Sequence, residues 1–345
     1  MLETATDKLP SPAPLPISTG SRLRRVLRRI AIGFGLLLVL IVGLILAGAS
    51  YEAIASGGDA KAYPPPGQLV DVGGYRLHIQ CMGSGSPTVV LDAGLGGTSL
   101  DWYLVQNDLS KTNRVCAYDR AGLGWSEAGP QPRTPNQIAR ELYTLLNNAG
   151  IEGPYVLVGH SLAGKNIRIF TQQHPDLVAG MVLIDARSEY VDAQTSLAEA
   201  QGFQDMMEAQ ENFKGLLRRV GLIRLVGASF WSMPGVPEKI STEMALLSTT
   251  QQSRDTVIAE AQGRAADDAQ LEAAPSLGNR PLIVLAAEQN MKELPNWPEA
   301  QQRLAALSTK GSLMVAKGSG HYIQLEQPGL VLDAVRQVVT QVRGH

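Results

Sequence analysis

The clearest candidate for chemistry is Ser161, which lies among small residues in the run Gly159-His160-Ser161-Leu162-Ala163-Gly164. The apolar stretch Tyr155–Val158 precedes this run, and a helical pattern follows it. Such a serine can attack a carbonyl carbon when a sharp turn from strand to helix lifts its hydroxyl clear of the chain. The usual spacing is G-x-S-x-G, and here Ala163 takes the second glycine position. Because alanine is the least bulky replacement, we expect a slightly tighter turn.

A serine nucleophile needs a base, and histidine is the usual one. Of the five histidines, we select His321, which follows the last predicted strand on the loop Lys317-Gly318-Ser319-Gly320. This loop is supple enough to bring an imidazole over the edge of a sheet. The other four histidines lie in a predicted strand, in the serine turn, at a helix end and at the chain terminus. Structural roles are favoured for the first three, His78, His160 and His174.

The third requirement is a pair of backbone N–H groups for the negative charge that forms on the attacked oxygen. The turn Ala93-Gly94-Leu95-Gly96-Gly97 follows an apolar run, and its lack of side chains leaves N–H groups free. We predict that the N–H groups of Leu95 and Leu162 form this oxyanion hole. A phosphate-binding loop is the alternative, but no G-x-G-x-x-G leads into a helix here and no Walker lysine follows.

These residues require a sheet whose strand ends bring them together. Several apolar runs lack alternation, which is typical of strands buried on both faces of a parallel sheet. The predicted strands are Tyr75–Cys81, Thr88–Asp92, Arg114–Tyr118, Tyr155–Val158, Met181–Ile184, Pro281–Ala286 and Ser312–Ala316. The predicted helices are Pro135–Ala149, Leu162–His174, Pro298–Leu307 and Leu330–Val342. Their alternation predicts a doubly wound α/β domain, and residues 186–279, which lack a strand-like run, predict a helical insertion.

From about Val70 to its C-terminus, the chain resembles the α/β-hydrolase fold superfamily. Five segments carry the resemblance in the family's order: Asp92–Gly97, Tyr118–Ser126, Gly159–Gly164, Met181–Asp185 and Gly318–Pro328. The resemblance implies a mostly parallel, eight-stranded sheet with helices on both faces. It also implies that residues 186–279 form a cap, which covers the active site and selects substrates.

The resemblance further implies an acid that orients His321. In many relatives this acid is an Asp a few residues past the strand written here as Pro281–Ala286, but this chain has Asn290 there. An amide cannot stabilise an imidazolium as a carboxylate does. The remaining candidates are Glu288, two positions earlier, and Asp185, at the end of the preceding strand, a position that some relatives use. We favour Asp185 and keep Glu288 as the alternative acid.

The N-terminal part of the chain differs from the rest. The run Ile30–Tyr51 carries no charge, and its 22 residues reach across a bilayer core at about 1.5 Å each. Five arginines precede it, whereas Glu52 and Asp59 follow. The positive-inside rule therefore predicts a transmembrane helix with its N-terminus in the cytoplasm and the rest of the chain outside. A cleaved signal peptide is the alternative, but its apolar run is shorter.

We therefore predict a basic cytoplasmic tail over residues 1–29, a transmembrane helix over 30–51, a proline-rich linker over 52–67 and a hydrolase domain over 68–345. A formal net charge of −2 provides no basic face for nucleic acid. The two cysteines are too few for a disulfide scaffold. Because Cys81 and Cys116 fall on strands that are neighbours in the family's sheet, one disulfide is conceivable.

A basic amphipathic stretch within the predicted cap carries Lys214, Arg218, Arg219 and Arg224 among apolar residues. We favour packing within the cap, with the arginines in solvent, over docking on anionic lipid.

Together these features predict a membrane-anchored serine hydrolase that acts on a small acyl substrate such as a carboxylic ester. We expect no cofactor and no metal, because the histidines and carboxylates lack the spacing of metal ligands. In this fold, epoxide and haloalkane hydrolysis use an aspartate nucleophile, so Ser161 argues against both. An amidase, peptidase or acyltransferase could use the same triad. A non-catalytic scaffold that binds a ligand or partner is the alternative outside enzymes, since Asn290 replaces the expected acid.

Overall fold

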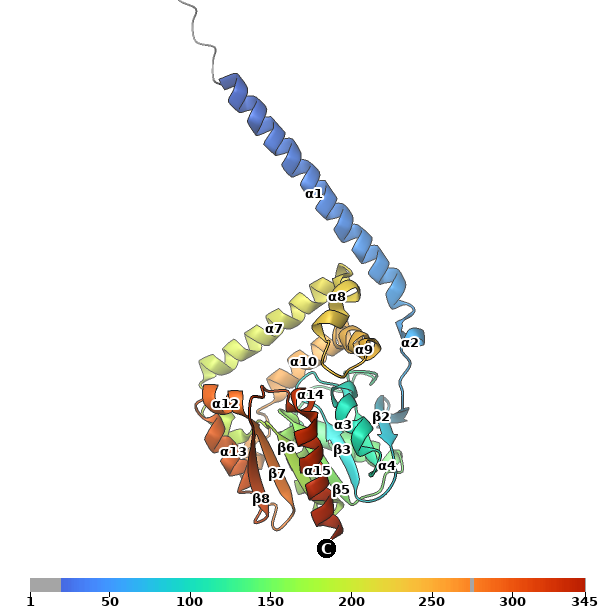
Figure 1. The fold of residues 1–345 in the computed structure, drawn as a ribbon, viewed down its shortest axis with the longest axis vertical. Helices are drawn as coiled ribbons and strands as arrows, with labels where there is room; N and C mark the ends of the chain where they lie inside the picture. The colour runs from blue at the N-terminus through green and yellow to red at the C-terminus, as the bar shows by residue number, and fades with distance from the viewer. Residues whose placement is uncertain (1–19, 274–275, 345) are drawn as a thin grey trace, which may run out of the picture.

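The computed structural model describes residues 20–273 and 276–344. The first nineteen residues of the tail predicted over 1–29 lie outside these ranges. From Gly20 onward, the described chain consists of one long helix that leads to a folded domain (Figure 1).

The folded domain is built on a sheet that has eight strands within the described residues, in the order β1-β2-β4-β3-β5-β6-β7-β8. The strands are β1 (Gln68–Asp71), β2 (Arg76–Met82), β3 (Thr88–Asp92), β4 (Val115–Tyr118), β5 (Tyr155–His160), β6 (Val178–Ile184), β7 (Leu282–Ala287) and β8 (Gly311–Ala316). Only the β1–β2 and β2–β4 pairs are antiparallel among these strands. The predicted α/β-hydrolase fold with a mostly parallel sheet is confirmed.

Helices cover both faces of the sheet. On one face pack α3 (Tyr103–Leu109) and α15 (Pro328–Arg343). On the other pack α4 (Pro135–Asn148), α5 (Ala163–Gln173) and α13 (Trp297–Ala305). Since successive side chains of a strand point to opposite faces, each inner strand must be apolar at every position, which explains the unbroken apolar runs.

One strand and several short elements escaped prediction. Strand β1 lies at the sheet edge, where only one of its four residues, Val70, is buried, so its sequence has no apolar run. Three short elements near the site are η1 (Ser99–Trp102), α12 (Glu288–Glu293) and α14 (Ile323–Glu326), and a fourth, η2 (Pro175–Leu177), leads into β6. Helices this brief show less than two turns of periodicity, so a sequence pattern cannot reveal them.

The segment between β6 and β7 contains only helices among its described residues. They are α6 (Glu189–Ala193), α7 (Leu197–Arg219), α8 (Leu222–Phe230), α9 (Glu238–Ser248), α10 (Gln251–Gly263) and α11 (Asp268–Glu272). Helices α7 to α10 lie over one edge of the sheet and form a cap (Figure 1). Both ends of the cap are tied to α5, because the fully buried ammonium of Lys165 pairs with Asp192 of α6 and Asp268 of α11.

Helix α1 (Gly20–Ser56) contains the whole predicted span of residues 30–51. Its part from Arg22 onward is long and apolar enough to cross a membrane, and its apolar window is not covered by the rest of the chain. The helix continues five residues beyond Tyr51 and is followed by α2 (Asp59–Ala62), so much of the predicted linker 52–67 is helical. The chain is non-helical from Tyr63 to Gly67, where the prolines stand.

Two arginines of the basic stretch, Arg218 and Arg224, are not solvated as predicted, whereas Arg219 is exposed. Arg224 places Nε 2.6 Å from Glu52 Oε2 and Nη2 2.6 Å from Asp59 Oδ2. Arg218 Nε lies 3.0 Å from Glu52 Oε1. The prediction was wrong because the partners are outside the cap, on α1 and α2, and pairing across that distance in sequence leaves no local pattern. These ion pairs fasten the end of α1 to the cap.

Cys81 and Cys116 form a disulfide between β2 and β4. The two residues are directly opposite each other in the antiparallel pairing of these strands. The suggested bond is therefore confirmed, and neither of the chain's two cysteines is left as a free thiol.

Candidate active site

Ser161 occupies the turn between β5 and α5 and has a φ of 52°, in the left-handed region that non-glycine residues rarely adopt. Its N–H donates to Ile184 O at 3.0 Å, and its C=O accepts from Gly164 N–H at 3.1 Å. A Cβ on Gly164 would lie 2.6 Å from Ala186 Cβ, whereas Ala163 fits with no exposed surface. A glycine is therefore required at position 164, where a side chain would clash with Ala186, and alanine is accepted at position 163.

Ser161, His321 and Asp185 form a continuous chain of hydrogen bonds. Ser161 Oγ lies 2.9 Å from His321 Nε2, and His321 Nδ1 lies 2.6 Å from Asp185 Oδ2. An ionised carboxylate can only accept hydrogen bonds, so the N–H of the neutral His321 ring lies on Nδ1 and donates a hydrogen bond to Asp185. Nε2 is then free to accept the serine proton. This arrangement provides a nucleophile, a base and an orienting acid within hydrogen-bond reach.

Asp185 is fully buried at the end of β6, also with a positive φ of 41°. Its Oδ1 accepts from the Ala287 N–H at 3.0 Å and from Trp297 Nε1–H at 2.7 Å. Its Oδ2 accepts from Asn290 Nδ2 at 2.5 Å in addition to His321. Asn290, which replaces the acid expected from the family, therefore donates to the carboxylate that contacts His321.

Glu288, the alternative acid, lies in a different environment. Its Oε2 accepts from the Gly318 N–H at 2.9 Å, and its Oε1 lies 3.0 Å from Lys292 Nζ. The Gly318 hydrogen bond, followed by Lys292, lowers the pKa of this partly exposed carboxyl. Of the two candidates the sequence left open, the structure brings Asp185 to His321, whereas Glu288 binds other partners.

The turn after β3 comes close to the nucleophile. A Cβ on Gly94 would lie 2.7 Å from His160 Nδ1 and 3.2 Å from Ser161 Cβ, so only glycine fits there. Within the described chain, no protein acceptor takes a hydrogen bond from the N–H of Leu95 or Leu162, the two predicted oxyanion donors. Both residues line the cavity that contains Ser161.

Arg120 fixes the turn after β3 by hydrogen bonds to two of its carbonyl groups, a role that the sequence did not reveal. Its Nη1 donates to Ala93 O at 2.5 Å and its Nη2 to Gly94 O at 2.7 Å. Since a trans peptide points its C=O and N–H in opposite directions, fixing Gly94 O also fixes the direction of the Leu95 N–H. The buried guanidinium is paired with Asp92 at 2.9 Å and with Glu260 of α10 at 2.7 Å.

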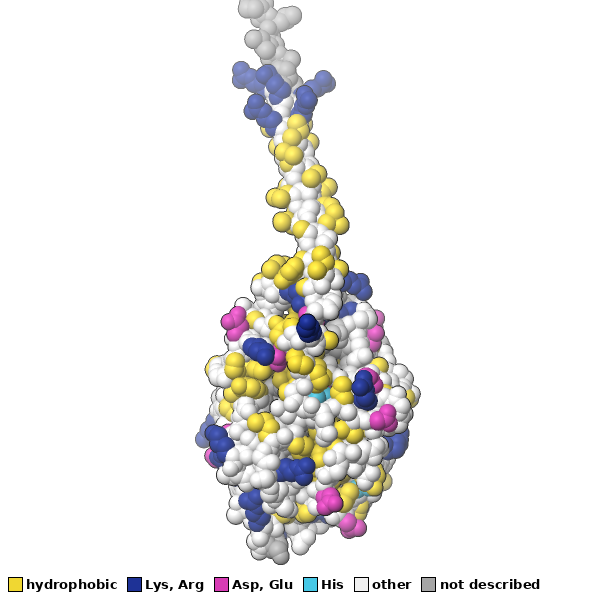
Figure 2. Space-filling model, turned by 90° about the vertical axis from the view of Figure 1, so that its right-hand side faces the viewer, with side chains coloured by type: hydrophobic (Ala, Val, Ile, Leu, Met, Phe, Trp, Pro, Cys, Tyr) yellow, Lys and Arg dark blue, Asp and Glu magenta, His cyan; other side chains and the backbone are white. Residues whose placement is uncertain are grey.

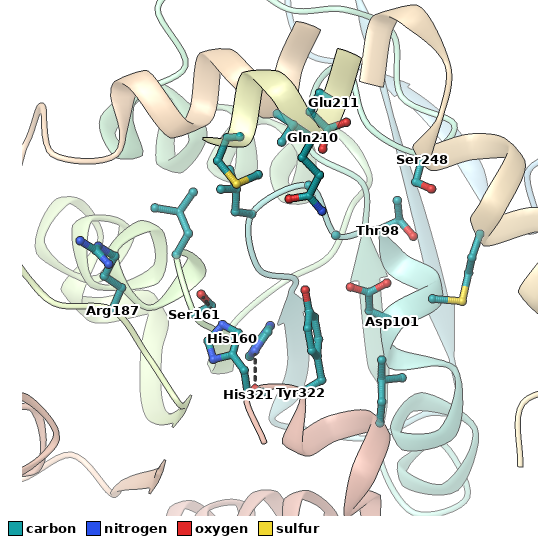
Figure 3. Close-up of a pocket in the computed structure, with 18 of the residues that line it drawn as sticks. Thr98, Asp101, His160, Ser161, Arg187, Gln210, Glu211, Ser248, His321 and Tyr322 are labelled. Carbon is teal, nitrogen blue, oxygen red and sulfur yellow. Dashed lines mark hydrogen bonds between the residues drawn. The ribbon is translucent and has the colours of Figure 1, made fainter. Parts of the chain in front are cut away.

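His160 is held neutral beside the triad. Its Nε2 lies 2.9 Å from the backbone oxygen of His321, and since a carbonyl only accepts, Nε2 carries the proton. Burial, followed by repulsion from His321, lowers the pKa of His160 well below its ordinary value. This ring therefore positions the His321 backbone and does not compete as a base (Figure 3).

The serine faces a cavity of about 660 Å³ between the sheet edge and the cap. Apolar side chains from the cap form much of its wall: Phe203, Met207, Phe230, Trp231, Met233, Met244 and Val257. Among the described residues, no group of three His, Cys, Asp or Glu side chains could hold a metal ion. The size and lining suit a small organic molecule.

Two carboxyl groups in this wall were not predicted. Asp101 of η1 and Glu211 of α7 both line the cavity and are labelled in Figure 3. Burial raises the pKa of Asp101 to about 7, so near neutral pH it can donate or accept a hydrogen bond. Glu211 pairs with Lys214 through Oε1 at 2.5 Å, while its buried Oε2 has no partner. No motif surrounds either residue, so the sequence carried no signal for them.

Comparisons with known proteins match the fold described above. A family model described as "alpha/beta hydrolase fold" matches residues 87–328. A probable transporter of Hormonema carpetanum, efuK, is 30% identical over 297 residues, which cover 79% of this chain. The chain spans about half the length of the first curated relatives it matches, 42% of efuK and 57% of an uncharacterized protein of Schizosaccharomyces pombe.

Solved structures match the fold. A thermophilic esterase from Thermogutta terrifontis is similar with a TM-score of 0.61 at 23% identity, over 80% of this chain and 98% of that one. The epoxide hydrolase CorEH gives a TM-score of 0.59 at 20% identity, over 80% and 98% of the two chains. At these identities the similarity concerns the fold alone.

Proposed function

Because the chain belongs to the alpha/beta hydrolase family, we propose that it is a serine hydrolase that cleaves carboxylic esters or related acyl compounds. The observation that carries this proposal is the hydrogen-bonded line from Ser161 through His321 to Asp185, which opens onto an apolar cavity. Since epoxide hydrolysis in this fold uses an aspartate nucleophile, Ser161 favours acyl chemistry.

The proposed reaction has two halves. Ser161 Oγ attacks the acyl carbon while His321 Nε2 takes its proton, and Asp185 stabilises the imidazolium that results. The N–H groups of Leu95 and Leu162 donate to the oxyanion, and His321 returns the proton to the leaving alcohol. Water then attacks the acyl-enzyme by the same route and releases the acid.

Two alternatives differ in their support. A non-catalytic scaffold was suggested by Asn290, but that argument weakens once Asp185 lies 2.6 Å from the base. Amide cleavage or acyl transfer would use the same three residues. A panel of acyl esters, aminoacyl amides and acyl acceptors separates these activities.

A fluorophosphonate probe tests the proposed nucleophile directly. Full-length protein in membranes is expected to form a covalent adduct that is absent from Ser161→Ala, because the probe reacts with an activated serine hydroxyl. Ser248→Ala is the matched control, since Ser248 lines the same cavity but its hydroxyl has no hydrogen-bond partner among the described residues. A folded wild-type protein that never reacts with the probe would exclude the hydrolase proposal.

We also propose that α1 spans a membrane with the hydrolase domain on the external side. The five arginines before the span support this orientation, and so does the Cys81–Cys116 disulfide, since such bonds persist in oxidising compartments. Protease added to intact cells is expected to digest the hydrolase domain while an N-terminal tag stays protected. The reverse pattern, with the tag digested and the domain intact, would refute this orientation.

A further inference from the structure

The corner between α7 and α8 packs directly on α1 within the apolar span. A Cβ on Gly48 would lie 2.1 Å from Val220 O, and one on Gly221 would lie 2.6 Å from Gly48 O. Gly48 is three residues before Tyr51, where the apolar run ends, which places it about 4.5 Å inside that end. The cap therefore reaches the level of the last turn of the span.

Ion pairs hold the corner in this position. Arg218 and Arg224 at the corner pair with Glu52 of α1 and Asp59 of α2, and all four side chains are largely buried. Because opposite charges meet within the contact, the corner brings few unpaired charges to the end of the span. The depth of α8 relative to α1 is thereby fixed.

Beside this contact, large apolar side chains point away from the protein. The exposed fractions are 70% for Leu225 and 73% for Phe230. We call this set the α7–α8 apolar face, and its members are Leu216, Leu222, Leu225, Val226 and Phe230. In Figure 2, hydrophobic side chains continue from α1 onto the part of the domain that adjoins it. Contiguous exposed patches of this kind mark interaction sites.

The position of the α7–α8 corner relative to the end of the apolar span indicates what covers this face. A helix that starts within about 5 Å of the end of a span, with apolar side chains outward, lies where lipid acyl chains meet head groups. Arg219 at the end of α7 is exposed, so its long side chain can reach lipid phosphates. A bilayer surface fits both the apolar and the basic groups.

The same face adjoins the cavity. Phe230 belongs to the exposed face and also lines the cavity, together with Trp231 and Met233 that follow it. On the inner side of α7, Phe203 and Met207 continue the apolar wall toward Ser161. An apolar path therefore leads from the outer surface of α8 to the nucleophile.

We propose that the α7–α8 apolar face rests in the interfacial layer of the bilayer and that the cavity takes a lipophilic acyl ester from the membrane. The membrane contact of the α7–α8 apolar face is the surface half of this inference, and the uptake of a lipophilic ester is the substrate half. Only the substrate half rests on the proposed function. The two halves need separate measurements.

The surface half is tested with an environment-sensitive fluorophore on Leu225→Cys in the full chain, reconstituted in phosphatidylcholine–phosphatidylglycerol vesicles. Both native cysteines are in the disulfide, so only the introduced thiol reacts. Val315→Cys on β8 is the matched control, since Val315 is apolar and 40% exposed but distant from α1 in Figure 1. We expect blue-shifted emission and quenching by spin-labelled lipid at position 225 only.

Water-like emission at position 225 would overturn the surface half. So would blue-shifted emission without lipid quenching, because a second copy of the chain would then cover the face.

The substrate half is tested by comparing a vesicle-embedded long-chain ester, p-nitrophenyl palmitate, with the soluble p-nitrophenyl acetate. The double variant Leu216→Gln and Leu225→Gln is expected to lower the palmitate-to-acetate rate ratio by about tenfold, because these positions lose apolar contact with lipid. Val315→Gln should leave the ratio unchanged. An unchanged ratio in the double variant overturns this half. If the wild type hydrolyses neither ester, the proposed function fails, and the fluorescence measurement still decides the surface.

Discussion

Replacing Asp185 with asparagine is expected to lower kcat by about 10⁴-fold, as loss of the orienting acid does in other serine hydrolases. The Asp185 carboxylate accepts the Nδ1–H of His321 at 2.6 Å and so keeps Nε2 available to Ser161. An asparagine offers an N–H in the same place, which favours the wrong tautomer of His321. Rates of ester hydrolysis and of fluorophosphonate labelling should fall together, while substrate KM changes little.

Glu288→Gln is the matched control, because it removes a carboxylate from the same sheet edge that contacts Gly318 and Lys292 instead of His321. It should keep nearly full activity. Thermal unfolding of Asp185→Asn separates catalysis from folding, since its buried neighbours Ala287 and Trp297 donate to the carboxylate. If Glu288→Gln lost activity and Asp185→Asn kept it, the role of the acid would pass to Glu288.

Replacing Arg120 with methionine is expected to damage both stability and turnover. The substitution leaves Asp92 and Glu260 buried without their cation, and breaking a buried pair in this way costs about 3–5 kcal/mol of folding free energy. For a domain of this size the melting temperature should fall by about 10 °C. It also frees the carbonyls of Ala93 and Gly94 in the turn after β3, where the proposed oxyanion donor Leu95 lies. The remaining folded enzyme should therefore lose about 10²-fold in kcat.

Arg120→Lys distinguishes the two effects. The lysine ammonium keeps the buried positive charge and much of the stability. It lacks the planar, forked guanidinium, so it cannot bind two carbonyls and two carboxylates at once. It should therefore melt closer to wild type and still show a reduced kcat. Arg76→Met, which breaks the exposed Arg76–Glu127 pair, should change neither quantity measurably. An Arg120→Lys variant with normal kcat would show that the guanidinium does not position the turn.

The parts of the site that were predictable have local signals. The turn around Ser161, the loop before His321 and the glycines after β3 each combine special backbone geometry with a neighbouring apolar strand, and a short window of sequence contains both. The sheet was predictable for the same reason, because burial on both faces forces unbroken apolar runs.

The parts that were missed depend on contacts between distant segments. Strands β6 and β7 are neighbours, so a carboxylate from the end of either one can reach His321, and only the side-chain packing distinguishes them. Asn290 was interpreted as a lost acid, whereas it donates to Asp185 across 105 positions. Arg120 joins the turn after β3 to Glu260 of the cap, 140 residues away, and nothing near Arg120 in the sequence indicates its partner.

The buried Lys165 has a mechanical consequence for the cap. It binds Asp192 and Asp268, which stand near the two points where the cap leaves and rejoins the sheet, and it belongs to the helix that begins just after Ser161. Hinge motion at those points would separate the buried Lys165 ammonium from both carboxylates, so the two ends of the cap are held in place. Any widening that admits substrate or releases product must then occur at the opposite rim, among α8 and α9. Helix α8 at that rim is held against α1 through Arg224 and Glu52, so movement of the rim depends on how α1 is held in the membrane.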